Sequence, residues 1–250
     1  MLDKFITPVI KPLLVPIVMA LHKRGVSADQ LTFYGFVVGL LAVPLLVFQL
    51  WYCALALIAV NRILDGLDGA LARYAEQSSS AGGFLDISLD FVFYAVIPLG
   101  FIFANPEQNA IAGAILLACF IGTGSSFLAF AIAAEKLNIN KIQFKYKSFY
   151  YLSGLTEGTE TIALFIAFCI WPDNFAILAL LFSCACIITI FTRIHGGYHT
   201  LKQYEINKGE INKSEVVHNN VNQNEIAHSE IIQSDTHVTV NVKAKTKNDS

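Results

Sequence analysis

The feature that most constrains the fold of this chain is a series of long apolar runs. A helix needs about 20 predominantly apolar residues to cross a bilayer. Six runs approach that length, and the fifth is the shortest: 31–50, 52–74, 82–104, 110–134, 158–172 and 175–195. Because 55% of the 250 residues are hydrophobic and only 14% are charged, a soluble domain is a poor match. The sequence therefore predicts an all-α integral membrane protein with a bundle of six transmembrane helices.

The distribution of basic residues predicts how this bundle is oriented. The turns near residues 49, 105–107 and 171–173 contain no Lys or Arg. The opposite flanks and turns carry Lys4, Lys11, Lys23, Arg24, Arg73, Lys136, Lys141, Lys145, Lys147, Arg193 and Lys202. By the positive-inside rule, both termini lie in the cytoplasm, as an even number of spans also requires. We expect a multi-pass protein of the cell (inner) membrane with its active site on the cytoplasmic side.

Two further segments flank the predicted transmembrane domain, which covers residues 31–200. Within residues 1–30, apolar side chains recur at helical spacing and predict an amphipathic segment at the membrane interface. Pro8, Pro12 and Pro16 predict that this segment is kinked. Residues 201–250 are rich in Asn, Ser, Thr, Lys and Glu, which is typical of a disordered cytoplasmic tail.

Four aspartates fall at helical spacing inside the second and third apolar runs. On the second run, Asp65 and Asp68 share one helix face, and on the third run Asp86 and Asp90 are four residues apart. A charged residue at the centre of a bilayer helix costs roughly 2.5–3.5 kcal/mol, so four of them require cations or a function. Carboxylate oxygens suit Mg²⁺ or Mn²⁺, and two such ions would bind the pyrophosphate of a phosphorylated substrate.

Other interpretations of these carboxylates explain only part of the pattern. Pairing with Arg62 or Arg73, or capping of helix ends, accounts for one or two aspartates but not for four. Small residues around them predict that the two helix backbones approach each other closely and leave room for a ligand. These residues are Gly66, Gly69, Ala70, Ala72, Gly82 and Gly83.

The complete pattern is Asp65-x2-Asp68-Gly69-x2-Ala72-Arg73-x8-Gly82-x3-Asp86-x3-Asp90. It resembles the signature of the CDP-alcohol phosphatidyltransferase family, with every signature position filled, and the topology extends the agreement to about residue 200. Ser27-Ala28 stands where that family often has Thr-Pro. The resemblance implies an enzyme of phospholipid biosynthesis that transfers a phosphatidyl group from a CDP-linked lipid donor, CDP-diacylglycerol in the leading interpretation, to an alcohol acceptor and releases CMP.

The resemblance also implies a role for each signature residue. Asp65, Asp68, Asp86 and Asp90 would bind two divalent cations, Mg²⁺ or Mn²⁺, and Asp90 would act as the general base. The cytidine diphosphate part of the donor would be held by Gly69, Ala72, Arg73, Ser79 and Gly82. A homodimer in contact with membrane lipids is implied, and no nucleic-acid partner is expected.

Several alternatives remain open from the sequence. A CDP-amino-alcohol phosphotransferase would use diacylglycerol as the acceptor. In a transporter the carboxylates would line a transport path, and a scaffold would bind without catalysing a reaction. Asn61 and Arg62 either support the acidic cluster or contact the substrate. The stretch 156–160 either caps the fifth span or binds acceptor hydroxyls. Four basic residues either bind a phosphorylated acceptor or are simply those expected on the cytoplasmic face of a membrane protein: Lys141, Lys145, Lys147 and Arg193.

Overall fold

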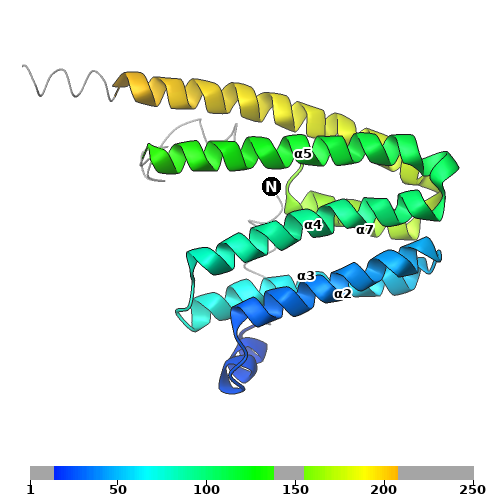
Figure 1. The fold of residues 1–250 in the computed structure, drawn as a ribbon, viewed down its shortest axis with the longest axis horizontal. Coiled ribbons are helices and arrows are strands. Elements are labelled where there is room, and N and C mark those ends of the chain that lie inside the picture. The colour runs from blue at the N-terminus through cyan, green and yellow to red at the C-terminus, as the bar shows by residue number, and fades with distance from the viewer. Residues whose placement is uncertain (1–13, 138–154, 208–250) are drawn as a thin grey trace, which may run out of the picture. The chain divides into compact units, whose positions relative to one another are not determined.

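The computed structural model describes residues 14–137 and 155–207, and all regular structure in these two ranges is helical. Figure 1 shows the labelled helices α2, α3, α4, α5 and α7 running alongside one another, with consecutive helices antiparallel. The elements, in chain order, are the helix Leu14–Lys23, α2 (Ala28–Val47), α3 (Trp51–Tyr74), α4 (Ser80–Ala104), α5 (Pro106–Lys136), α7 (Gly158–Ile170), the 3₁₀ turn η1 (Pro172–Asn174) and a last helix that ends at Asn207.

Each of the six predicted apolar runs forms a helix, but only four helices are both long and apolar enough to cross a membrane. These four are α2, α4, α5 and the stretch Pro172–Asn207. Helix α3 is 24 residues long but carries Arg62, Asp65, Asp68 and Arg73, whereas α7 has only 13 residues. The prediction of an all-α multi-pass membrane protein is confirmed, and the count of six spans stays a prediction.

Local signals in the sequence determine where these helices begin. Ser27 caps α2, because its Oγ accepts a hydrogen bond from the backbone N–H of Gln30 at 3.2 Å while the Gln30 side chain accepts from the Ser27 N–H at 3.1 Å. Asn105 caps α5, because its Oδ1 accepts a hydrogen bond from the backbone N–H of Gln108 at 3.4 Å, and Pro106 occupies the first turn, where no amide partner is needed.

Helix α2 forms the closest backbone contacts of the bundle, with α3 on one side and α4 on the other. Gly39 allows this approach: a Cβ added there would lie 2.8 Å from the Phe93 ring and 2.9 Å from Nδ2 of Asn61. The prediction that small residues bring α3 and α4 together is wrong, because these two helices share few close backbone contacts and Gly66 and Gly83 face open space. Those glycines leave room beside the carboxylates instead.

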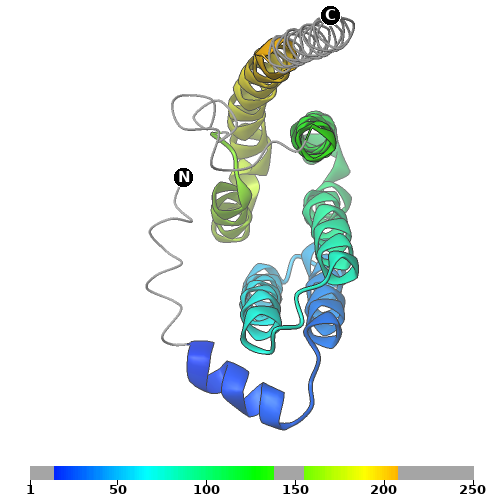
Figure 2. The same cartoon turned by 90° about the vertical axis from the view of Figure 1, so that its left-hand side faces the viewer.

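Figure 2 shows the resulting arrangement nearly end-on, with α2, α4 and α5 following one another and α3 beside α7. Aromatic side chains fill the core between these helices. Phe101 of α4 stacks on Trp51 at 5.3 Å and on Phe175 at 5.1 Å between ring centroids, and Phe165 and Phe168 of α7 complete the group. This aromatic core holds α7 against α3 and α4.

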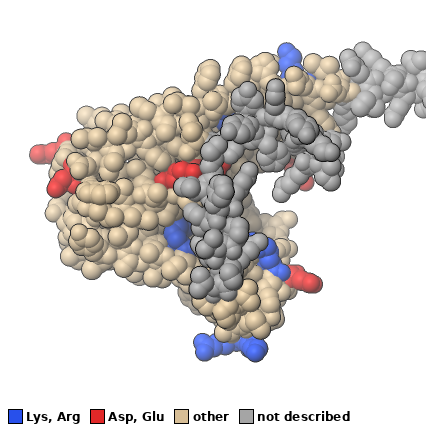
Figure 3. All heavy atoms as spheres, turned by 180° about the vertical axis from the view of Figure 1, so that it is seen from behind, with Lys and Arg blue, Asp and Glu red and all other residues tan. Residues whose placement is uncertain are grey.

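Turns without basic residues lie together at one end of the bundle. Gln49 donates to the carbonyl of Ala104 at 3.4 Å, and Gln108 donates to the carbonyl of Asp173 at 3.0 Å. The surface between the two ends is apolar, and the face shown in Figure 3 carries few charged side chains. Large exposed apolar side chains include Phe48, Phe84, Phe103, Ile111, Ile121, Ile132, Leu181 and Phe191. Lipid is the solvent that suits such a surface.

The helix Leu14–Lys23 packs against the ends of α2 and α3. Val18 is buried against Leu31 and Leu71. Pro16 lies in the first turn of this helix, where its missing amide N–H has no intrahelical partner to lose. The kinks predicted at Pro8 and Pro12 lie outside the described residues, and so does the tail beyond Asn207.

The contacts divide the chain into two units, Met1–Gly197 and Tyr198–Ser250. The first unit contains all the elements described above up to Gly197. In the second unit, the described residues 198–207 are helical. The domain boundaries predicted at residues 30 and 200 stay predictions.

Candidate metal centre and substrate site

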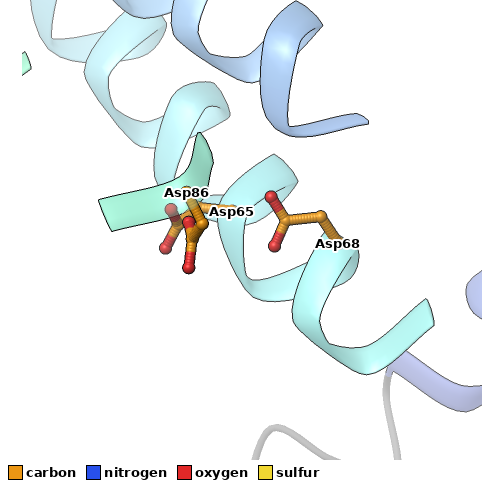
Figure 4. A group of neighbouring side chains, drawn as sticks. All are labelled: Asp65, Asp68 and Asp86. Carbon is orange, nitrogen blue, oxygen red and sulfur yellow. The ribbon is translucent and has the colours of Figure 1, made fainter. Parts of the chain in front are cut away.

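Three of the four predicted metal ligands lie together between α3 and α4. Asp65 and Asp68 come from α3 and Asp86 from α4, and each offers a carboxylate oxygen within 4.8 Å of the other two. Figure 4 shows the three side chains gathered at this place. Because Asp65 and Asp68 are three residues apart on one helix face, both point towards α4. The helical spacing in the sequence predicted this convergence.

The donor set and its surroundings fit a divalent cation. Asp68 is 5% exposed, and its Oδ2 has no hydrogen-bond partner among the described residues. A buried carboxylate oxygen without a donor is costly, and a cation would satisfy it. The carboxylates line a small cleft of about 10 Å³, which has room for an ion or a single water molecule. Three carboxylates at this separation therefore fit Mg²⁺ or Mn²⁺ in their ligand chemistry.

Asp90 lies one turn further along α4 and has different partners. Its Oδ1 accepts a hydrogen bond from Arg62 Nη2 at 2.8 Å, and its Oδ2 accepts from the Tyr94 hydroxyl at 3.5 Å. Asp90 lines the same cleft as the other three aspartates but is outside their close group. Its carboxylate is thus oriented by a guanidinium and a phenol.

Arg62 is held by a network that spans three helices. Its Nε donates to Asn61 Oδ1 at 2.7 Å, and Nδ2 of the buried Asn61 donates to the carbonyl of Gly35 on α2 at 2.8 Å. The guanidinium lies 4.6 Å from the centroid of the Phe93 ring and 3.5 Å from an oxygen of Asp65. Asn61 and Arg62 therefore support the acidic cluster, which is one of the two interpretations that the sequence left open.

Sequence reasoning missed Tyr94. Its position four residues after Asp90 places both side chains on one face of α4, and that spacing was the available signal. An intramembrane tyrosine is common enough in helix packing that the spacing alone did not single it out.

The residues predicted to bind cytidine diphosphate lie on the last two turns of α3, just before α4 and in its first turn. Arg73 is exposed on the last turn of α3, and its guanidinium lies 3.3 Å from the position that a Cβ on Gly69 would occupy. A larger side chain at position 69 would displace this guanidinium. Ala72 is half-buried on the neighbouring turn.

Ser79 and Gly82 form the start of α4. Ser79 caps the helix, since its Oγ accepts from the backbone N–H of Gly82 at 2.9 Å. A Cβ on Gly82 would lie 2.9 Å from Oδ1 of Asp29, which belongs to the first turn of α2. Asp29 was not singled out by the sequence. The nucleotide-binding roles of Gly69, Ala72, Arg73, Ser79 and Gly82 stay predictions.

Two weaker sequence signals have clear structural outcomes. Glu157 stands at the N-cap of α7, and its backbone N–H donates to the Glu160 side chain at 3.2 Å, so this acidic stretch caps the helix as one interpretation had it. Arg193 is buried, and its Nη1 donates to the carbonyl of Thr123 at 2.9 Å. The other members of the predicted basic group, Lys141, Lys145 and Lys147, lie outside the described residues.

Comparisons with known proteins agree with the sequence resemblance. The model of the family "CDP-alcohol phosphatidyltransferase" matches residues 26–192. Inner membrane protein YnjF of Escherichia coli (strain K12) is 56% identical over 205 residues, which cover 82% of this chain and 99% of the relative. An archaetidylinositol phosphate synthase of Pyrococcus horikoshii is 41% identical over 100 residues, which cover 40% of this chain and 53% of that protein.

Solved structures of a phosphatidylinositol phosphate synthase from Mycobacterium tuberculosis share this fold. The structure with CDP-DAG bound matches with a TM-score of 0.57 and 18% sequence identity, over 75% of this chain and 94% of the other. The complex with manganese and citrate matches with a TM-score of 0.56 and 18% identity, over 74% and 88% of the two chains. At this identity the likeness establishes the arrangement of the helices.

Proposed function

The chain belongs to the CDP-alcohol phosphatidyltransferase family, and from that premise we propose that it transfers a phosphatidyl group from CDP-diacylglycerol to the hydroxyl of a small alcohol. The family is divalent-metal dependent, and the three grouped carboxylates fit that requirement. The observation that carries the proposal is this group of Asp65, Asp68 and Asp86 from two helices of an apolar bundle. A structural ion-pair role would not leave a buried carboxylate oxygen without a partner.

In this proposal, Asp65, Asp68, Asp86 and Asp90 hold two divalent cations, Mg²⁺ or Mn²⁺. When bound, the cations supply positive charge that binds the diphosphate and stabilises negative charge on the leaving phosphate. Arg73 binds a phosphate oxygen of the donor with its planar guanidinium. Gly69, Ala72, Ser79 and Gly82, at the last turns of α3 and the first turn of α4, contact the nucleotide in this proposal, and the open space beside Gly66 and Gly83 supports room for it there.

The transfer step balances without any further reactant. The acceptor hydroxyl oxygen forms a new bond to the phosphorus that carries diacylglycerol, and the bond from this phosphorus to the bridging oxygen of the diphosphate breaks. CMP leaves with that oxygen, and the hydroxyl proton passes to the carboxylate of Asp90. Arg62 and Tyr94 hold this carboxylate in a fixed orientation within the cleft.

We also propose that the protein has six spans, with both termini and the mouth of the cleft in the cytoplasm, and that it forms a homodimer. The basic residues at one end of the bundle support the orientation. The apolar surface of the described helices supports the membrane location.

The test is an assay of CMP release by purified protein in liposomes that contain CDP-diacylglycerol, Mn²⁺ and a pool of water-soluble alcohols, with mass spectrometry of the lipid products. New phosphodiester lipids and stoichiometric CMP are expected. Parallel liposomes with diacylglycerol and CDP-choline or CDP-ethanolamine test the reversed polarity. If product forms only in the second assay, the protein is instead an amino-alcohol phosphotransferase. If CMP is released in neither assay, a transporter or scaffold is favoured.

A further inference from the structure

A large cavity lies beside the carboxylate cleft, between α4, α5, α7 and the last helix. Its volume is about 890 Å³, which exceeds the volume of a small alcohol and lies within the range of ligand pockets. One part of its lining is apolar, with side chains such as Leu99, Phe120 and Leu128. Polar side chains occupy the other part: Thr123, Ser125, Thr156, Glu157, Thr161 and Arg193.

Tyr94 connects this cavity to the proposed reaction centre. Its side chain lines the cavity, while its hydroxyl donates to Asp90 at 3.5 Å. The Tyr94 hydroxyl also lies 3.4 Å from the position of a Cβ on Gly158, which lines the cavity beside Glu157. Tyr94 therefore stands between the polar part and the proposed base. This placement rests on the function proposed above and makes the polar part a candidate acceptor site.

The charged groups of the polar part compensate each other. Among the described residues that line the cavity, the charged ones are Arg193 and Glu157. Arg193 is 6% exposed, donates to the Thr123 carbonyl at 2.9 Å and lies 5.6 Å from the centroid of the Phe127 ring. The carboxylate of Glu157 interacts electrostatically with this guanidinium. With one charge of each sign, the described lining has no net charge when both side chains are ionised.

Charge compensation of this kind selects against an anionic ligand. A phosphate group placed beside Arg193 would also lie near the Glu157 carboxylate, and like charges interact strongly where water is excluded. A neutral or zwitterionic alcohol meets no such penalty. The threonine and serine hydroxyls around the pair donate and accept hydrogen bonds that suit acceptor hydroxyls.

We propose that Glu157 is a specificity-determining residue, which restricts the acceptor to alcohols without net negative charge and excludes phosphorylated alcohols. Glu157 also stands at the N-cap of α7, so an ordinary structural role competes with this one. Asparagine caps a helix as well as an acidic residue does but carries no charge, and aspartate keeps both properties. The two substitutions therefore separate specificity from helix capping.

The experiment measures kcat/KM for different acceptors in liposomes that contain CDP-diacylglycerol and Mn²⁺. The unphosphorylated acceptors are glycerol, myo-inositol and L-serine, and the phosphorylated acceptors are sn-glycerol 3-phosphate and inositol 1-phosphate. Wild-type protein is expected to prefer the alcohols without phosphate. In Glu157→Asn, the ratio of kcat/KM for phosphorylated to unphosphorylated acceptor is expected to rise at least about tenfold. Glu157→Asp is expected to keep the wild-type ratio. Glu135→Gln removes a carboxylate on α5 that does not line the cavity and is expected to leave the ratio unchanged.

The outcomes distinguish this inference from the proposed function. Preference of the wild type for a phosphorylated acceptor, or an unchanged ratio in folded Glu157→Asn, overturns the role of Glu157 while phosphatidyl transfer stands. If no acceptor supports CMP release, the proposed function is overturned and this inference falls with it. Size-exclusion profiles and Mn²⁺-dependent CDP-diacylglycerol binding report folding, and Glu157→Ser is the second capping variant if the asparagine variant does not fold.

Discussion

At the scale of single residues, the four aspartates of the motif differ in their surroundings. Asp65, Asp68 and Asp86 form a compact group, whereas Asp90 is held by Arg62 and Tyr94. Helical spacing predicted that Asp65 and Asp68 share a face of α3 and that Asp86 and Asp90 share a face of α4, but it did not predict that Asp90 would lie outside the compact group. It did not predict the partners of Asp90, since Arg62 and Asp90 come from different helices and meet only through tertiary packing.

Asp65→Asn tests the metal centre. The substitution removes one anionic ligand while the side chain keeps its size, so Mn²⁺ affinity and CMP release are each expected to fall by at least about 100-fold. Isothermal titration with Mn²⁺ and the liposome assay measure the two quantities. Glu107→Gln, on the exposed first turn of α5, is the matched control. Mn²⁺ binding at wild-type affinity in Asp65→Asn would contradict the assignment.

Asp90→Asn tests the general base. Transfer is expected to fall by about 10²–10⁴-fold, because the amide cannot accept the hydroxyl proton. Binding of CDP-diacylglycerol is expected to persist, since Asp65, Asp68 and Asp86 remain. Single-turnover CMP release and donor binding by the same preparation provide the measurement. Turnover close to the wild-type rate would remove Asp90 from this role.

Arg62 is proposed to position the Asp90 carboxylate, and the substitutions Arg62→Lys and Arg62→Met test this role. Lysine keeps the charge but lacks the planar fork that contacts both Asp90 and Asn61. We expect kcat to fall by about tenfold in Arg62→Lys and further in Arg62→Met, with KM for the donor little changed. One lost hydrogen bond to a charged group corresponds to about 1.5–3 kcal/mol. A change confined to KM would instead indicate direct contact with the donor.

At the scale of the elements, apolar periodicity and capping signals predicted where helices lie but not how they pair. All six apolar runs form helices, and α3 and α4 agree with their predicted bounds to within two residues. Small residues beside the motif were expected to bring α3 and α4 together. The close approach occurs instead at Gly39 of α2, because Phe93 and Asn61 fill the space that a side chain would need. A single sequence does not show which partner a glycine faces.

Gly39→Ala and Gly66→Ala form a matched pair that tests this packing. An added Cβ at position 39 would contact Phe93 at 2.8 Å, whereas position 66 has no neighbour within 4 Å. Gly39→Ala is expected to lower the free energy of unfolding by about 1–3 kcal/mol through overpacking. Gly66→Ala is expected to be neutral or stabilising by up to about 1 kcal/mol, as alanine favours the helix. Thermal unfolding in detergent measures both, and equal effects would contradict the packing.

At the scale of the whole molecule, the turns divide into two sets. The turns that lack Lys and Arg are joined by hydrogen bonds from Gln49 to Ala104 and from Gln108 to Asp173. The α3–α4 turn and the C-terminal end of α5 lie at the opposite end of the bundle (Figure 1). Charge distribution in the sequence predicted this division. The sequence raised residues 156–160 and Arg193 as possible acceptor-binding residues, but it did not predict that they line one cavity, because this lining comes from four separate helices.

Labelling of single cysteines tests the orientation of the bundle. In a variant with all five native cysteines replaced, Glu107→Cys is expected to react with a membrane-impermeant maleimide in intact spheroplasts. Glu76→Cys, at the exposed turn after α3, is expected to react only after the membrane is permeabilised. The reverse labelling pattern would invert the topology and place the aspartate cluster on the outer side.

Helix α7 has consequences for the lipid around it. Its 13 residues span about 20 Å, against roughly 30 Å of hydrocarbon, whereas the 31 residues of α5 span about 46 Å. Hydrophobic mismatch of opposite sign on two helices of the bundle favours local thinning of the bilayer near α7 and tilting of α5. Under the function and the acceptor site proposed above, a hydrophilic alcohol would cross less hydrocarbon to reach Glu157 at the start of α7. We therefore expect the catalytic rate to depend on the acyl-chain length of the host membrane.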